Sequence, residues 1–243
     1  MIMHIEDYQL LFRENYKLND SITIRHPTLD EIFDVGEREY MSIVSLLTAS
    51  PKDYRSQLFD IGIDFEEIND FELFLITSNG MGERDTGILF EGLNFKDFVV
   101  AFEPKINQNV LVDLEKKIVI DRATYENISE YIRKMHGIQK DTKVAGNKHT
   151  KKVLTDLHRQ DVLLNSRTPY KSTLCPLISS MVNSAGFKYN YETVLSLTIY
   201  KFMDAVQRIQ KIKGYEGLMS GMYSGNIDIK KIPNKDEILN WMG

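Results

Sequence analysis

The chain has 243 residues, of which 42% are apolar and 27% are charged, the composition of an ordinary globular protein. A single cysteine, Cys175, excludes an internal disulfide framework and a cysteine-based zinc site. The net charge is −5, but residues 1–141 carry −12 and residues 142–243 carry +7. This asymmetry indicates either two regions that meet different partners or two halves that attract each other and pack together.

The first residues of the chain predict a strand followed by helix. The alternation of apolar and polar residues at 21–25 predicts a short strand. Thr28 and Glu31 have the spacing of a capping box, which predicts a helix that begins there and runs to about residue 49. Gly36 lies inside this helical run and predicts a break or a kink.

The middle of the chain predicts further helices and a small sheet. Ser50-Pro51 begins another helix, whereas residues 71–76 fit a strand or a buried helical turn equally well. Strand-like runs follow, the last two joined by a charged hairpin turn, at residues 88–90, 98–102, 110–114 and 117–120. Asp121 then caps a helix that has one apolar face and ends near Gly137.

The second half predicts mainly helices. Residues 143–161 form a polar helix with a narrow apolar stripe, Ser172 caps a shorter helix, and residues 190–212 form the longest helix. Residues 214–225 are punctuated by glycines, which indicates either close helix packing or a loop with positive φ angles. Asn234 caps a short last helix.

These elements predict an α+β fold. We expect a small, mainly antiparallel sheet with helices in the N-terminal part and a mainly helical C-terminal part. Both the charge and the type of secondary structure change near residue 140. We therefore predict an acidic α+β region at residues 1–140 and a basic, mainly helical region at residues 141–243.

Catalytic patterns are sparse. The histidines accompany neither a Gly-x-Ser-x-Gly elbow nor a His-Glu-x-x-His pair. A metal-dependent nuclease needs carboxylates for the cation and a lysine near the attacking water, and Asp97, Asp113, Glu115 and Lys117 offer part of that set. A solvated charged turn explains the same residues. We therefore expect no enzymatic activity, no cofactor and no metal site, with a nuclease kept as an alternative.

One candidate partner-binding surface is basic. Lys148, Lys151 and Lys152 share one helical face, and Arg159 follows further along the same helix. Several cations on one surface suit nucleic acid, an acidic protein partner or the acidic half of this chain. Aromatic side chains for base stacking are absent nearby until Tyr170. We therefore favour protein as the partner, do not expect nucleic acid, and keep a nucleic-acid-binding module as an alternative.

A second candidate partner-binding surface lies in the glycine-punctuated stretch at residues 214–225. Its apolar members are Tyr215, Leu218, Met222 and Tyr223. The glycines allow close approach of a backbone, so this stretch suits contact with a partner. Packing within the core of this chain explains the same residues.

Short segments near both ends of the chain resemble one family. They are HPTLDEI at residues 26–32, followed by Gly36-Glu37 and Tyr40, then DIGID at 60–64, FELF at 71–74, YKF at 200–202, YSGNIDIKK at 223–231 and NWM at 240–242. These segments resemble the tail-morphogenesis proteins of tailed bacteriophages, especially those of Gram-positive hosts. None of the segments carries catalytic chemistry.

The resemblance implies a non-enzymatic phage protein that acts in tail assembly through protein–protein contacts. Within that group we favour a tail assembly chaperone or a closely related tail-associated component, and the resemblance then implies the tape-measure or tail-tube proteins as partners. A permanent virion component, such as a connector, tail or baseplate subunit, is the alternative. We expect the host cytoplasm or the virion as the location, no membrane, and leave homo-oligomerisation open.

Overall fold

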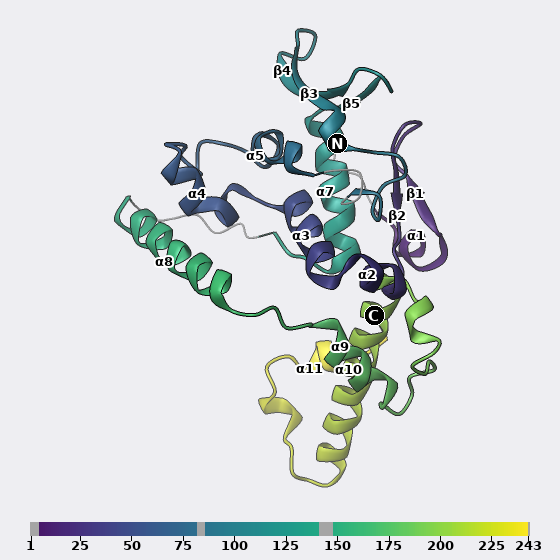
Figure 1. The fold of residues 1–243 in the computed structure, drawn as a ribbon. Helices are drawn as coiled ribbons and strands as arrows, with labels where there is room; N and C mark the ends of the chain where they lie inside the picture. Colours follow the sequence, from purple (N-terminus) through teal and green to yellow (C-terminus); the bar gives the residue numbers. More distant parts are fainter. Residues whose placement is uncertain (1–4, 82–85, 141–147, 243) are drawn as a thin grey trace.

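The computed structural model describes residues 5–81, 86–140 and 148–242 (Figure 1). The fold is α+β with a mainly helical C-terminal part, as the sequence predicts. The helices are α1 (Asp7–Phe12), α2 (Leu29–Val35), α3 (Glu37–Thr48), α4 (Arg55–Asp60), α5 (Asp70–Thr77), α7 (Arg122–His136), α8 (Lys148–Arg167), α9 (Leu174–Val182), α10 (Ile199–Tyr223) and α11 (Lys235–Leu239). Short 3₁₀ turns cover Pro51–Tyr54, Ser78–Gly80, Phe95–Asp97, Val194–Ser196 and Ile229–Lys231.

The described strands form two small antiparallel sheets. Strand β1 (Asn15–Lys17) pairs with β2 (Thr23–Arg25). Strands β3 (Phe98–Glu103), β4 (Gln108–Asp113) and β5 (Ile118–Ile120) form a meander in that order, which confirms the predicted hairpin between β4 and β5.

The strand predicted at residues 88–90 is absent from the described sheets. The backbone N–H groups of Leu89 and Phe90 instead donate to the carbonyl oxygen of Thr86, at 3.0 and 2.9 Å, so the segment turns. Phe90 forms an isolated antiparallel bridge with Ile24 of β2, flanked by backbone hydrogen bonds from Arg25 N–H to the Leu89 carbonyl at 2.8 Å and from Glu91 N–H to the Thr23 carbonyl at 3.3 Å. A turn so close to a strand edge gives the same apolar sequence run as a short strand.

The predicted break at Gly36 separates α2 from α3. Thr28 and Glu31 form the capping box of α2, with the backbone N–H of Glu31 donating to Thr28 Oγ1 at 3.2 Å. Gly36 has a φ of 103°, a conformation that costs a glycine little and other residues more. A helix boundary at this residue follows directly from that backbone geometry.

Residues 71–76, which fit a strand or a helical turn, belong to helix α5. The Asn69 side chain accepts from the backbone N–H of Glu72 at 3.0 Å, and the Glu72 side chain accepts from the backbone N–H of Asn69 at 2.8 Å. This reciprocal pair is a capping box, and it satisfies amides that would otherwise be unpaired at the helix start. Phe71, Leu73 and Phe74 of this helix are buried.

The longest helix differs from the prediction of residues 190–212, because α10 begins at Ile199 and continues to Tyr223. The backbone before it is held extended: Leu29 N–H donates to the Leu197 carbonyl at 2.9 Å, and Ile199 N–H donates to the Pro27 carbonyl at 3.0 Å. Helix can therefore begin only after this pairing ends. Towards the other end, the glycines at 214, 217 and 221 lie inside the helix and have negative φ angles.

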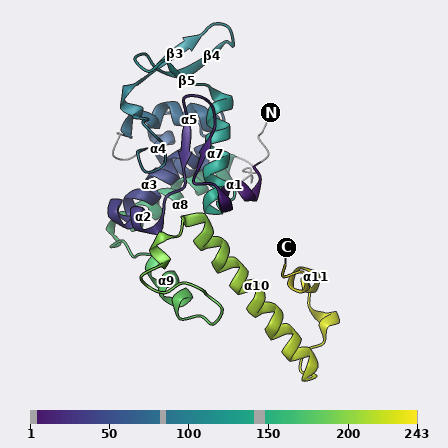
Figure 2. The ribbon, with the colours of Figure 1, turned by 90° about the vertical axis from the view of Figure 1, so that its right-hand side faces the viewer.

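Helix α7 lies at the centre of the fold and contributes Tyr125, Ile128, Tyr131 and Ile132 to the main hydrophobic cluster. This cluster also includes residues of β2, α3, α9 and the first turns of α10, so the core continues across residue 140. The division at that residue stays a prediction. From the core, α10 extends away from the body with α11 folded back beside it (Figure 2).

Across the helices that the structure describes, none has the length and apolar character needed to cross a membrane.

Candidate partner-binding surfaces and a polar pocket

Helix α8 lies against α4 (Figure 1), and its basic residues pair with acidic residues of the first half. Lys151 Nζ contacts the carboxylates of Asp64 and, at 3.0 Å, Glu66. Arg159 Nη2 lies 2.6 Å from Asp60 Oδ1. Burial lowers the pKa of Lys151, but its two carboxylate partners outweigh that and hold the pKa above its usual value.

The predicted basic surface is therefore divided by the fold. Lys151 and Arg159 are engaged by the acidic half of the same chain, which is the second of the two explanations that the charge asymmetry allows. Lys152 is exposed to solvent. The side chain of Lys148 lies outside the part that the structure describes, although its backbone begins α8.

The outer face of α8 carries an exposed apolar row, which we call the α8 stripe: Val153, Leu157 and Leu164. These residues lie on one side of the helix at intervals of four and seven residues. Leu157 is 50% exposed and Leu164 is 62% exposed. On the opposite side of the same helix, Thr155 is buried and His158 Nδ1 lies 2.9 Å from Ser56 Oγ of α4.

The second predicted surface, on the last turns of α10, is also divided. Tyr215 packs against Trp241, with ring centroids 6.0 Å apart, and Leu218 is buried. Met222 is half-buried, whereas Tyr223 is 83% exposed. Tyr215 and Leu218 therefore serve packing within this chain, and Tyr223 is the member that solvent reaches most.

The glycines of α10 have different surroundings. A Cβ atom at Gly221 would overlap the side chain of Ile227, which follows the helix, whereas a Cβ at Gly217 would meet no atom within 4 Å. The backbone N–H of Ile227 donates to the Gly221 carbonyl at 3.0 Å. Close packing, one of the two explanations that the sequence allows, holds at Gly221.

A junction that sequence reasoning missed joins α3 to the start of α9. Glu37 is buried, and its carboxylate accepts hydrogen bonds from the Ser172 hydroxyl, from the backbone N–H and hydroxyl of Thr173 at 2.8 Å each, and from Leu174 N–H at 3.0 Å. Burial raises the pKa of Glu37, but these donors outweigh burial and lower the pKa to about 2. Nothing in the local sequence indicates that a residue so distant in the chain caps α9.

The residues of the nuclease alternative lie around the β4–β5 turn. Asp113 is buried, and its Oδ1 accepts from the backbone N–H groups of Glu115 and Lys116 at 3.0 and 2.9 Å. Lys117 has a φ of 56° in the same turn. These contacts give Asp113 a role in shaping the turn. Within the described ranges, no group of three or more His, Cys, Asp or Glu side chains is placed to hold a metal ion.

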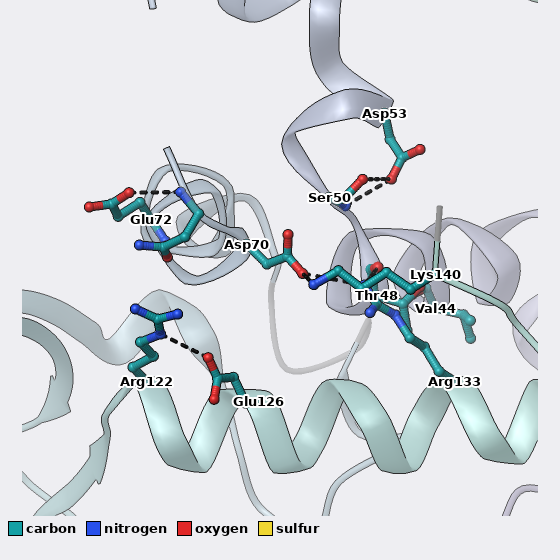
Figure 3. Close-up of polar contacts among 11 residues, drawn as sticks. Val44, Thr48, Ser50, Asp53, Asp70, Glu72, Arg122, Glu126, Arg133 and Lys140 are labelled. Atoms are coloured by element: carbon teal, nitrogen blue, oxygen red, sulfur yellow. Dashed lines mark hydrogen bonds and ion pairs between the residues drawn. The ribbon is translucent and has the colours of Figure 1, made fainter. Parts of the chain in front are cut away.

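A polar cluster joins α5 to α7 (Figure 3). Asp70 Oδ2 lies 2.5 Å from Lys140 Nζ and 3.8 Å from Arg133 Nη2. Arg133 also donates to the backbone carbonyl of Thr48, at the end of α3. One arginine of α7 therefore contacts both α3 and α5 beneath the surface.

A pocket of about 290 Å³ lies beside this cluster, between α5 and α7. Three of its lining residues from α7, Tyr125, Ser129 and Arg133, are buried. Among the described residues, Arg133 Nε lacks a hydrogen-bond partner, whereas the Tyr125 and Ser129 hydroxyls interact with each other. Sequence reasoning missed this pocket because its walls come from segments about 50 residues apart that carry no joint motif.

Residues 167–243, about a third of the chain, match the family model described as "YomV second domain". No curated protein and no solved structure matches the chain. The matched family is phage-derived, and the similarity of residues 167–243 to it therefore suggests a phage protein.

Proposed function

We propose that this chain is a non-enzymatic tail-assembly protein of a phage, of the chaperone type, and that it binds the tape-measure protein through the α8 stripe. The observation that carries the proposal is the apolar row on the outer face of α8. Contiguous exposed apolar side chains on one side of a helix are a common feature of protein-binding surfaces. The phage-type family match over residues 167–243 supports a phage context.

The position of α8 suits this role. Its inner face is attached to the body by the Lys151 and Arg159 ion pairs, which leaves the stripe turned away from α4. A helix presented in this way can pack its apolar face against an amphipathic helix of a partner. A long helical protein offers such a partner, and the resemblance to tail assembly chaperones implies the tape-measure protein.

The test places aspartate at Leu157 and Leu164 together in the phage genome. Because both side chains are exposed, the variant is expected to fold, but a charge on the stripe should weaken partner binding. We expect tailless particles by electron microscopy and loss of the tape-measure protein from affinity purifications. The matched control replaces Asn165 and Ser166, exposed α8 residues that lie off the stripe, by aspartate, and it should assemble normal tails.

Normal tails in the Leu157 and Leu164 double variant would refute the role of the stripe. Mass spectrometry of purified virions separates the chaperone from the virion component. A chaperone is absent from finished particles, whereas a connector, tail or baseplate subunit is present in fixed copy number.

A further inference from the structure

We propose that the outer edge of strand β3 pairs with the same edge of a second copy of this chain, antiparallel and about a two-fold axis. The contact joins two three-stranded sheets into one continuous sheet. This inference goes beyond the proposed function and does not depend on it, because α8 is not part of the edge. The sheet stands at the opposite end of the molecule from α10 (Figures 1 and 2).

The outer edge of β3 has backbone groups without partners. The order of the sheet is β3-β4-β5, so β3 has a neighbouring strand on one side only. Phe98 N–H donates to the Phe95 carbonyl, which indicates that the backbone of Phe98 faces away from β4. Because the residues of a strand alternate, Val100 and Phe102 also direct their N–H and C=O groups outward. Among the described residues, no other backbone group pairs with these two.

The side chains at this edge are apolar and exposed. Val100 is 48% exposed and Phe102 is 59% exposed. They are two positions apart in the strand, so they lie on the same face of the sheet. The strand has the sequence FVVAFE, without the lysine or proline that commonly prevents edge strands from pairing. An open edge of this kind is a template for a further strand.

Two-fold symmetry restricts the register of the pairing. In an antiparallel pair, two residues directly opposite each other either both direct their backbone groups at the partner or both direct them away. For two copies of one strand, the numbers of opposite residues therefore add up to an even number. Two such registers overlap most of β3: one is centred on Val100 and pairs residues 98–102, and the other is centred on Ala101 and pairs residues 99–103.

Charge selects the register centred on Ala101. Centring on Val100 would place Asp97 opposite Glu103 at both ends of the contact, and opposite residues of like charge repel each other. Centring on Ala101 instead brings Asp97 towards the turn of the second copy that carries Lys105. Asp97 and Lys105 are both exposed, so each end of the contact gains a pair of opposite charges.

The same register covers the exposed apolar side chains. Val100 of one copy lies opposite Phe102 of the other, and the two-fold axis repeats this pair. Pairs of aromatic and β-branched side chains across neighbouring strands are favourable. The outward N–H and C=O groups of the same two residues can then exchange hydrogen bonds. The register that charge selects therefore also satisfies the open backbone edge.

The test measures sedimentation equilibrium of the full chain at concentrations from about 1 μM to about 100 μM. Val100→Lys places a charge at the proposed contact. Val119→Lys is the matched control, because Val119 is also 48% exposed but belongs to β5, at the other edge of the sheet. We expect the wild type and Val119→Lys to shift from 28.2 kDa towards twice that mass as the concentration rises, and Val100→Lys to stay at 28.2 kDa.

Three results would overturn the proposal. A wild-type chain that keeps the monomer mass at every concentration would mean that the β3 edge does not pair with a second copy. A Val100→Lys variant that dimerises like the wild type would place the contact elsewhere. A Val119→Lys variant that stays monomeric would show that the β3 edge alone does not explain the dimer.

A charge exchange tests the register. Asp97→Lys should weaken dimerisation about tenfold, because it sets two lysines against each other at both ends of the contact. Asp97 also accepts a hydrogen bond from Asn94 Nδ2 of its own chain at 3.1 Å, so the decisive measurement is the recovery. Asp97→Lys combined with Lys105→Asp restores opposite charges and should return the affinity to the wild-type value. A double variant as weak as Asp97→Lys would refute the register centred on Ala101.

Discussion

The Glu37 junction predicts a specific pH dependence of stability. Glu37 accepts four hydrogen bonds at the start of α9, and its pKa is lowered from a usual value of 4.5 to about 2. Each pKa unit corresponds to about 1.4 kcal/mol, so the charged form contributes at most about 3 kcal/mol to the free energy of unfolding. Glu37→Gln keeps the shape and an acceptor oxygen but removes the charge, and it should lose most of that contribution at pH 7.

The sign of the pH effect follows from the direction of the pKa shift. Because the folded-state pKa is below the unfolded-state value, the contribution is complete above pH 4.5 and is lost as the pH falls towards 2. At pH 3 it should have fallen to roughly 1 kcal/mol. The difference in stability between wild type and Glu37→Gln should therefore shrink on acidification.

The assay is urea unfolding followed by far-ultraviolet circular dichroism at pH 7, 5 and 3. The control is Glu39→Gln, which removes a charge from the same turn of α3 at an exposed position and should change the stability by less than about 0.5 kcal/mol. A Glu37→Gln variant as stable as wild type at pH 7 would refute the reasoning. So would a difference that stays constant down to pH 3.

Three further predictions concern other contacts. Burial lowers the pKa of His136 to about 4, so on acidification this histidine is protonated in the unfolded chain before it is protonated in the folded chain. The free energy of unfolding should therefore fall between pH 6.5 and 4. His136→Gln should reduce that fall by up to about 3 kcal/mol in the same unfolding assay. Gly217→Ala should raise the Tm, because alanine favours a helix by about 1 kcal/mol over glycine and a Cβ atom has space there. Gly221→Ala should raise the Tm less or lower it, because its Cβ would overlap Ile227. Equal increases in the two variants would contradict the close packing at residue 221. Lys151→Glu should speed amide hydrogen exchange in α8, because the new carboxylate would face the two carboxylates that Lys151 now contacts. Lys152→Glu should leave the exchange unchanged. Equal exchange rates in the two variants would refute the attachment of α8 to α4.

Features set by neighbours in the sequence could be predicted from the sequence. The capping box at Thr28, the helix break at Gly36 and the cap at Asp121 each depend on a few adjacent residues, and the structure confirms all three. The start of α10 could not be predicted, because pairing with residues 27–29 fixes it and that pairing forms only in the folded chain. Residues 71–76 are a nearly continuous apolar run, which has no period to separate strand from helix.

In the candidate sites, too, the sequence indicates features that depend on neighbouring residues but not features that depend on contacts between distant segments. Sequence reasoning selected the basic residues of α8 but could not show that Lys151 and Arg159 face acidic residues about 90 positions earlier. It also missed Arg133, which in the sequence is one of several charges near the end of an amphipathic helix. Only the packing of α7 against α3 and α5 reveals that this charge is buried.

The contacts that residues 167–243 make with the rest of the chain restrict the transfer of this segment to another protein. Helix α9 takes its cap from Glu37, and the backbone before α10 takes hydrogen-bond partners from residues 27–29. A graft of the segment onto an unrelated scaffold would leave those amides and carbonyls unsatisfied unless the new host supplied an acidic side chain and an extended strand in the same places. Chimaeric proteins joined at residue 167 should therefore fold only when the host protein supplies both the acidic side chain and the extended strand.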